Sequence, residues 1–144
     1  MKVAIFDIDG TIADCTHRQH HVEARPKDWD AFYEGMDDDV PREPVVALLR
    51  AVEAVYPVIL CTGRPLSYRP RIVRWLDKHA IPYRELYCRH DGDFRDDTIV
   101  KREMLQLIRA VGFEPLFTVD DRAKVVAMWR SEGLVCFQCD EGNF

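Results

Sequence analysis

The fold is decided by residues 2–11, KVAIFDIDGT, where an apolar run ends in two aspartates one residue apart. Residues 3–6 form a short, continuous apolar run, which is typical of a strand buried on both faces of a parallel sheet. Asp7 and Asp9 follow this run, and Gly10 provides a turn directly after them. In open α/β sheets, ligands bind beyond the carboxyl ends of the strands. The two acids therefore indicate a functional site at the end of the first strand.

Short apolar runs alternate with amphipathic segments along most of the remaining chain. The predicted strands are Lys2–Asp7, Pro57–Thr62, Glu85–Cys88, Leu116–Val119 and Leu134–Gln138. The predicted helices are Pro44–Val55, Ser67–His79, Thr98–Val111 and Ala123–Glu132. This alternation indicates βαβ units and a mainly parallel sheet with helices on both faces. The sequence therefore predicts an α/β fold, with residues 1–144 forming one Rossmann-like domain of three layers.

One segment interrupts the alternation. Residues 15–43, between the first strand and the next helix, are polar and too numerous for an ordinary strand-to-helix loop. Within them, Asp28 is a candidate cap for a short helix that carries Trp29, Phe32 and Tyr33. We interpret the segment as a small lid, or flap, over the carboxyl end of the first strand. The alternative is a surface excursion that its aromatic residues hold against the body of the protein.

Composition excludes several classes of protein. The net charge of −5 argues against a protein that grips duplex DNA with a broad basic face. Five cysteines and no leader-like segment favour a reducing compartment over a disulfide framework. No apolar run approaches the roughly 18 residues that a membrane span requires. We therefore expect a cytoplasmic protein that does not enter a membrane.

Polar residues also follow the second and fourth predicted strands. The second strand ends in Thr62-Gly63-Arg64, the fourth ends in Asp120-Asp121, and Lys101 lies in the helix before the fourth strand. Because parallel strands end at the same edge of a sheet, four carboxylates would share one small volume. Like charges about 4 Å apart repel by about 4 kcal/mol per pair at an effective dielectric constant of about 20, so the cluster needs a cation. Oxygen ligands of this kind suit Mg²⁺, while Lys101 and Arg64 can offset the remaining charge.

The same residue types divide the steps of phosphoryl transfer between them. A carboxylate held against Mg²⁺ can attack phosphorus and form an aspartyl-phosphate. A second carboxyl two residues later can protonate the leaving oxygen and then accept a proton from water. Thr62, Lys101 and main-chain N–H groups near Gly10 and Gly63 can hold the remaining phosphoryl oxygens.

Taken in order, these motifs resemble those of the haloacid dehalogenase-like phosphohydrolases. The matching residues are Asp7, Asp9 and Thr11 in D-x-D-x-T, then Thr62, Lys101 and the pair Asp120-Asp121. The resemblance implies that Asp7 is the nucleophile and Asp9 the acid/base. It also implies that Asp7, the Asp9 carbonyl and the acidic pair bind Mg²⁺.

Longer stretches resemble the phosphatase domain of the phage-type polynucleotide kinase-phosphatases, which removes 3′-phosphates from nucleic-acid ends. They are FRDDTIVKREMLQLI at 94–108, FTVDDRAKVVAMWRSEGLVCFQ at 117–138 and GNF at 142–144. The likeness covers nearly the whole chain and is weakest in the lid segment. It implies a set of substrate-binding residues, namely Thr11, Arg18, Gly63, Arg64, Arg89 and Arg95. Arginine suits this task because its planar, bidentate donors match phosphate.

Other roles remain open for three of these arginines. Arg18 and Arg95 could be solvated loop residues, and Arg89 could pair with Asp91 or Asp93. The kinase half of such enzymes needs a Gly-x-x-x-x-Gly-Lys-Ser/Thr loop, which this sequence lacks. If the chain is complete, a separate kinase or ligase polypeptide is a candidate partner. The sequence does not indicate an oligomeric state.

Three further features are interpreted as structural or solvated rather than functional: the pair Cys136 and Cys139, the histidines His17, His20 and His21, and the run Asp37–Asp39. Trp29 and Tyr33 could stack on a nucleobase or simply pack inside the lid segment. The leading hypothesis is a Mg²⁺-dependent phosphomonoesterase that acts on the 3′-phosphate of DNA or RNA ends. The alternatives are a phosphatase for free mononucleotides or other small phosphoesters, and a module that binds nucleic-acid ends without turnover.

Overall fold

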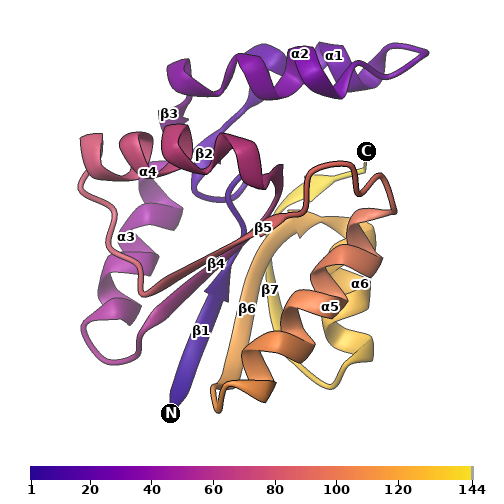
Figure 1. Cartoon of the computed structure of the whole chain (residues 1–144). Helices are drawn as coiled ribbons and strands as arrows, with labels where there is room; N and C mark the ends of the chain where they lie inside the picture. Colours follow the sequence, from indigo (N-terminus) through magenta and orange to yellow (C-terminus); the bar gives the residue numbers. More distant parts are fainter. Residues whose placement is uncertain (144) are drawn as a thin grey trace.

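A five-stranded parallel sheet forms the centre of the protein, described here for residues 1–143 of a computed structural model. The strands are β1 (Lys2–Phe6), β4 (Val58–Pro65), β5 (Glu85–Arg89), β6 (Glu114–Arg122) and β7 (Val135–Gly142). Their order is β5-β4-β1-β6-β7, and each neighbouring pair runs parallel. All five strands therefore end at the same edge, the upper one in Figure 1. The predicted α/β fold is confirmed.

Two helices cover each face of the sheet (Figure 1). They are α3 (Glu43–Glu53) and α4 (Arg69–Lys78) on one face, and α5 (Asp97–Ala110) and α6 (Ala123–Ser131) on the other. Side chains of β1 alternate between the two layers, since Phe6 packs toward α3 and α4 and Ile5 packs toward α5 and α6. The continuous apolar run of β1 is thus buried on both faces, as its sequence predicted.

Three strands continue three or more residues beyond their predicted ends, and β4 is the first of them, because it ends at Pro65 instead of Thr62. β6 continues to Arg122 instead of ending at Val119, and β7 continues to Gly142 instead of ending at Gln138. The extensions of β6 and β7 pair with each other, because Arg122 aligns with Gly142 in the parallel register. The acidic pair of β6 is therefore held in extended backbone rather than in a loop.

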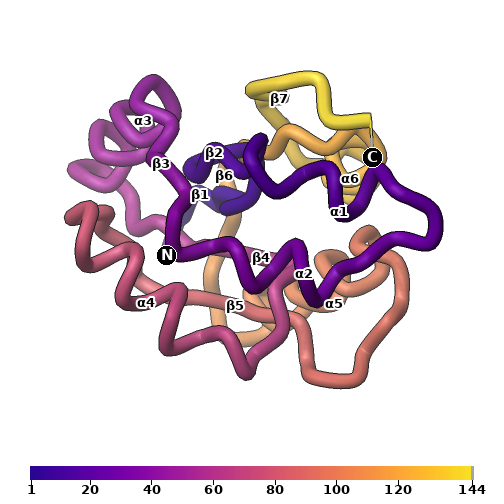
Figure 2. Tube along the Cα trace, turned by 90° about the horizontal axis from the view of Figure 1, so that it is seen from above, coloured from indigo at the N-terminus to yellow at the C-terminus, as the bar shows by residue number. Residues whose placement is uncertain are grey.

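The lid segment lies across the carboxyl ends of the strands. A two-stranded antiparallel sheet, β2 (Ala13–Asp14) and β3 (Val40–Pro41), closes its base. Between them lie the 3₁₀ turns η1 (Thr16–Arg18) and η2 (Met36–Asp38) and the helices α1 (His20–Glu23) and α2 (Trp29–Glu34). Figure 2 shows α1 and α2 crossing in front of the sheet when it is viewed from this end.

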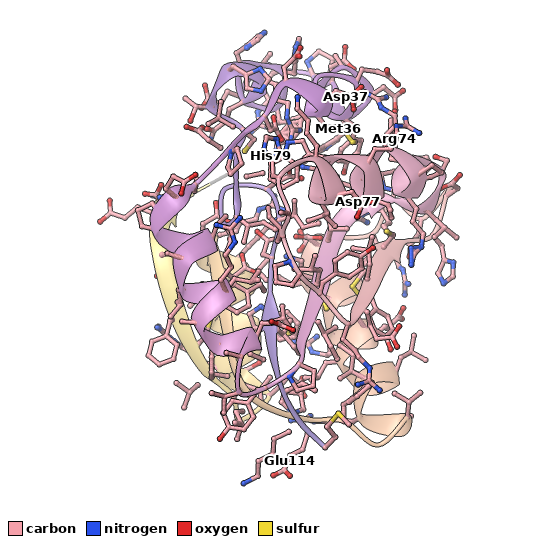
Figure 3. All side chains as sticks on the ribbon, turned by 90° about the vertical axis from the view of Figure 1, so that its left-hand side faces the viewer. Met36, Asp37, Arg74, Asp77, His79 and Glu114 are labelled. Carbon is pink, nitrogen blue, oxygen red and sulfur yellow. The ribbon has the colours of Figure 1, made fainter. Side chains whose placement is uncertain are left out.

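Contacts with the body hold the lid segment in place. Asp28 caps α2 by accepting a hydrogen bond from the Ala31 N–H at 3.0 Å, as predicted. η2 packs against α4, and Figure 3 shows Met36 and Asp37 beside Arg74 of that helix. Met36 is fully buried in the same core as Phe6. Among residues 1–143, no helix is long and apolar enough to cross a membrane.

Candidate active site

Asp7 lies directly after β1 and has a hydrogen-bond partner on each carboxylate oxygen. The Lys101 ammonium, from α5, donates to Asp7 Oδ1 at 2.8 Å, and the Thr11 hydroxyl donates to Asp7 Oδ2 at 3.0 Å. The Asp7 N–H donates to the carbonyl of Val119 in β6. These contacts orient a carboxylate that is only 6% exposed, at the floor of a cavity.

Two more carboxylates from β6 join Asp7. Asp7, Asp120 and Asp121 each offer an oxygen within 4.8 Å of the other two, and all three residues are buried. Lys101 also donates to Asp120 Oδ2 at 3.1 Å, and the indole N–H of Trp129 donates to the same oxygen at 3.2 Å. We call Asp7, Asp120, Asp121 and Lys101 the acidic cluster.

The acidic cluster carries more negative than positive charge. Burial, followed by repulsion from Asp120, raises the pKa of the Asp7 carboxyl well above its usual range. The same two causes raise the pKa of Asp121 to about 6. Burial alone would lower the pKa of Lys101, but Asp120 and Asp7 raise it, so its ammonium stays charged. Three carboxylates against one ammonium form a donor set that fits a divalent cation with a preference for oxygen, such as Mg²⁺.

The turn after β1 allows Asp121 to come close. Gly10 has φ of +79°, and an added Cβ there would lie 2.1 Å from Asp121 Oδ2. Only glycine fits this position. The Gly10 N–H donates to the Ala13 carbonyl at 2.9 Å, so this N–H is not aimed at a phosphate. Thr11 is fully buried behind Asp7, and its hydroxyl also lies 3.3 Å from Asp121 Oδ1.

Asp9 contacts two buried arginines instead of the acidic cluster. Arg64 Nη2 donates to Asp9 Oδ1 at 2.6 Å, and Arg18 Nη2 donates to the same oxygen. Burial opposes ionisation of Asp9, but the guanidinium groups of Arg64 and Arg18 outweigh it and hold its pKa well below the usual range. The Asp9 carboxyl is therefore charged in this arrangement.

Asp39 completes this second cluster and corrects part of the sequence interpretation. It is 3% exposed, and it accepts hydrogen bonds from Arg18 Nε at 2.8 Å and Arg64 Nη2 at 3.3 Å. His17 Nε2 lies 2.7 Å from Asp39 Oδ1. The interpretation of Asp37–Asp39 as a solvated run was therefore wrong for Asp39, whereas His17 is exposed, as expected, and contacts Asp39 from the surface. We call Asp9, Asp39, Arg18 and Arg64 the arginine cluster.

The predicted substrate arginines occupy different environments. Arg18 is 1% exposed, which rules out a solvated loop, and Arg64 is also fully buried. Arg89 Nε donates to the Gly63 carbonyl at 2.9 Å, and Arg89 Nη1 donates to the carbonyl of Asp93 at 3.1 Å. Arg95 is largely exposed, and pairs with the carboxylates of Asp93 and Glu103.

Thr62 and Gly63 lie at the end of β4. The Thr62 hydroxyl is fully buried and accepts the Arg64 N–H at 3.1 Å, so it fixes the backbone beside the arginine cluster. Gly63 lines the cavity, and an added Cβ there would lie 2.6 Å from Asp97 Oδ1. Asp97, at the start of α5, was not singled out from the sequence. Asp97 Oδ1 lies 3.2 Å from Arg89 Nη2. The turn between β5 and α5 brings the two residues together.

A cavity of about 350 Å³ joins these features to the lid segment. Its wall includes Asp7, Asp9, Gly63, Arg89, Arg95, Lys101, Asp120 and Asp121 from the predicted site. Trp29 and Tyr33 also line it, and the mostly buried Tyr33 donates from its hydroxyl to the Gly63 carbonyl at 3.1 Å. The cavity is thus large enough for a nucleotide-sized ligand and reaches the carboxylates at its floor.

The remaining features take structural positions. Cys136 is buried under α6, and Cys139 lies 3.8 Å from the Thr11 hydroxyl. Neither belongs to a group of potential metal ligands among the described residues, 1–143. His20 and His21 contact each other in α1, with ring centroids 3.9 Å apart.

Comparisons with known proteins agree with this geometry. The family model described as "Polynucleotide kinase PNKP phosphatase domain" matches residues 1–144. A chain in a structure titled "Structure of Pnkp1/Rnl/Hen1 complex" is 34% identical, with a TM-score of 0.85 over 99% of this chain and 47% of that chain. A chain in a second structure, titled "Structure of the Pnkp1/Rnl/Hen1 RNA repair complex", is also 34% identical, and the match covers 99% of this chain and 43% of that chain. The present chain thus spans about half the length of these relatives.

More distant structures share the fold alone. A haloacid dehalogenase-like family hydrolase from Streptococcus pneumoniae is 14% identical, with a TM-score of 0.69 over 94% of this chain and 83% of that chain. The family model matches the whole chain, so the assignment to a family rests on sequence as well as on fold. The chain belongs to the polynucleotide kinase PNKP phosphatase-domain family, and it is a phosphatase of the haloacid dehalogenase-like type.

Proposed function

We propose that this member of the family is a Mg²⁺-dependent phosphomonoesterase that removes the terminal 3′-phosphate from DNA or RNA. The observation that supports this most is the acidic cluster at the floor of the cavity, with the arginine cluster beside it. The first offers a nucleophile among oxygen ligands, and the second holds Asp9, the candidate acid/base, on the wall of the same cavity.

Residues of the acidic cluster would hold the metal. Asp7, Asp120 and Asp121 would bind Mg²⁺ together with the Asp9 carbonyl, as the family resemblance implies. When bound, Mg²⁺ supplies positive charge that offsets the carboxylates and the charge that develops on the phosphoryl group. Lys101 donates a hydrogen bond to one Asp7 oxygen, and Thr11 donates one to the other. The orientation of the carboxylate is therefore fixed before the substrate binds.

The reaction would proceed in two steps. An oxygen of Asp7 attacks phosphorus while the bond from phosphorus to the 3′ oxygen breaks, and Asp9 gives that oxygen its proton. Water then attacks the aspartyl-phosphate, Asp9 accepts the proton, and inorganic phosphate leaves Asp7 free.

Asp9 can carry a proton only if its environment changes. Arg18 and Arg64 hold its pKa low in the present arrangement. A substrate phosphate in the cavity would place negative charge beside Asp9, which lines the cavity wall, and a neighbouring negative charge raises the pKa of a carboxyl. In this account, substrate binding itself prepares the acid.

An assay of phosphate release tests the proposal. We expect release from a 3′-phosphorylated oligonucleotide in Mg²⁺, none in excess chelator, and much slower release from the same strand phosphorylated at its 5′ end. No release from the 3′-phosphorylated strand at any Mg²⁺ concentration would contradict the proposal.

A phosphatase for free nucleotides is the second candidate. The 350 Å³ cavity supports it, because that volume accommodates one nucleotide without any further strand. Values of kcat/KM for a nucleoside 3′-monophosphate, a nucleoside 5′-monophosphate and an oligonucleotide end separate the two candidates. A preference for 5′-monophosphates would favour the second.

A kinase or ligase partner is also a proposal. It is supported by the titles of the similar chains, which name a complex of Pnkp1 with Rnl and Hen1. Purification of the tagged protein from its native source, followed by kinase and ligase assays of the eluate, would test it. An eluate that shows phosphatase activity but neither kinase nor ligase activity would count against a stable partner.

A further inference from the structure

Three cations lie together on the wall of the cavity and take no part in the mechanism above. They are Lys27, Arg122 and Lys124, which we call the basic rim. Lys27 comes from the turn between α1 and α2, Arg122 ends β6, and Lys124 lies in the first turn of α6. The basic rim thus joins the lid segment to the strand that carries the acidic pair.

Lys27 differs from the other two cations in its pairing with carboxylates. Lys124 pairs with Asp96 at 2.6 Å, and Arg122 lies 3.5 Å from Asp97 Oδ2. Lys27, by contrast, forms no ion pair with any carboxylate among residues 1–143, and its Nζ instead lies 5.7 Å from the centre of the Trp29 ring.

The cations of this region also act on one another. Burial lowers the pKa of Lys27, and three neighbouring cations lower it further. These cations are Arg25, Arg122 and Lys124. Only Asp96 acts in the opposite direction among the principal causes. An anion bound here would relieve this repulsion, so the basic rim is suited to a negatively charged group.

The place of the basic rim suggests which anion it binds. Lys27 lines the same cavity as Asp7, and Arg122 directly follows the acidic pair, so an anion there would lie beside the phosphate that reacts. A nucleoside monophosphate carries one phosphate, which the carboxylate end of the cavity would occupy. A polynucleotide strand also carries a phosphodiester on the 5′ side of its terminal nucleotide.

We propose that Lys27, supported by Arg122 and Lys124, forms a second phosphate subsite that binds the phosphodiester preceding the 3′-terminal nucleotide. The inference rests on the proposed function and adds the chemical group that distinguishes a strand end from a free nucleotide. The subsite favours polynucleotide ends through binding, and it takes no part in bond cleavage.

The kinetic test compares Lys27→Ala with wild type on two substrates. For a 3′-phosphorylated oligonucleotide we expect kcat/KM to fall about tenfold, mainly through KM, and its salt dependence to weaken by about 0.7 in log–log slope, as the loss of one phosphate contact requires. For a nucleoside 3′-monophosphate, which lacks the preceding phosphodiester, we expect no change. Lys27→Arg should restore most of the loss.

Lys2→Ala is the matched control, because Lys2 is an exposed lysine at the opposite end of β1. It should leave both substrates unaffected. A parallel fall on both substrates in Lys27→Ala would overturn the subsite, because it would mean that Lys27 acts on the reaction or on the fold of the lid segment. No change on either substrate would overturn it as well.

A binding measurement separates this inference from the proposed function. Fluorescence anisotropy with a labelled single strand that ends in a 3′ hydroxyl requires no turnover. We expect Lys27→Ala to weaken this binding by a similar factor, and Lys2→Ala to leave it unchanged. If wild type releases no phosphate from either substrate but shows this difference in binding, the proposed function fails and the subsite stands. Equal binding by the three proteins would overturn the subsite.

Discussion

Two buried ionic clusters lie side by side at the end of β1, and they differ in their balance of charge. The acidic cluster contains three carboxylates and one ammonium, whereas the arginine cluster contains two carboxylates and two guanidinium groups. Asp7 and Asp9 are only two residues apart, yet burial and Asp120 raise the pKa of Asp7, whereas Arg64 and Arg18 lower that of Asp9 against the effect of burial. The first cluster is incomplete without a cation, and the second is neutral by itself.

The difference has a structural cause. β1 ends at Phe6, so Asp7 and Asp9 no longer follow the alternation of a strand, in which residues two apart share a face; Asp7 faces β6 and α5, which carry acids and Lys101. Asp9 lies within the turn that follows β1 and faces the lid segment and the end of β4, which carry Arg18 and Arg64. The two aspartates of one short motif, Asp7 and Asp9, thus belong to two different clusters. The first is suited to bind a metal, and the second consists of ion pairs. The predictions below test this distinction, from the largest expected effect to the smallest.

Asp7→Asn should abolish turnover while it preserves the fold. An amide cannot act as the nucleophile, so we expect phosphate release to fall by about a thousandfold or more. The substitution also removes one charge from a crowded set of carboxylates, so the midpoint of thermal unfolding should stay level or rise. Undiminished release by this variant would remove Asp7 from the mechanism.

Asp39→Asn should destabilise the arginine cluster. It leaves two buried guanidinium groups with one carboxylate, and breaking a buried pair in this way costs about 3–5 kcal/mol in free energy of unfolding. Asp37→Asn is the matched control, because Asp37 is an exposed neighbour that pairs with Arg71, and we expect a cost of about 0–1 kcal/mol. Urea denaturation measures both. Equal losses in the two variants would contradict the distinction that we draw between Asp39 and Asp37.

Mg²⁺ should stabilise the acidic cluster alone. At about a hundred times its dissociation constant, a ligand that binds only the folded state adds about 2.7 kcal/mol of stability. We expect an increase in the unfolding temperature of wild type in Mg²⁺, compared with NaCl of equal ionic strength, and little increase in Asp121→Asn. An equal increase in Asp121→Asn would place the metal elsewhere.

The effect of Mg²⁺ should also depend on pH. The carboxyl of Asp121, with its pKa raised to about 6, takes up a proton in the folded protein at a higher pH than it would in the unfolded chain. Without metal, the free energy of unfolding should therefore rise as the pH falls from 7 toward 5. Because protons compete with Mg²⁺, the stabilisation by Mg²⁺ should shrink over the same interval. A gain from Mg²⁺ that is constant with pH would contradict this account.

His17→Ala should have the smallest effect. The His17 ring reaches Asp39 from the surface, and its side chain is 44% exposed. Because the arginine cluster is balanced without His17, we expect a loss of about 1 kcal/mol or less in free energy of unfolding. A loss as large as that of Asp39→Asn would mean that His17 belongs to the cluster.

The sequence was sufficient to predict the sheet and the acidic cluster. Asp7, Lys101 and the pair Asp120-Asp121 lie at strand ends or in the helix beside them, and parallel strands bring such positions together whatever the loops do. The helix capped by Asp28 was likewise a local signal, since the cap and the aromatic residues are only a few positions apart.

The arginine cluster could not be predicted to the same extent. The burial of Asp39 depends on the path of the lid segment, which returns the chain to β2 and places Asp39 under two arginines that are distant in sequence. A run of three aspartates gives no signal of which member turns inward. Asp97 was not predicted for a similar reason, because the turn between β5 and α5 places it beside Arg89.

The central claim is that Asp7 accepts the phosphoryl group. It is tested most directly by rapid acid quenching of the enzyme with an oligonucleotide that carries a radioactive label in its 3′-phosphate. In Mg²⁺ we predict that label is transiently attached to wild-type protein, that hydroxylamine releases it as an acyl phosphate would, and that Asp7→Asn takes up none. Steady release of labelled phosphate with no label on the wild-type protein at any time, together with release by Asp7→Asn, would contradict the account.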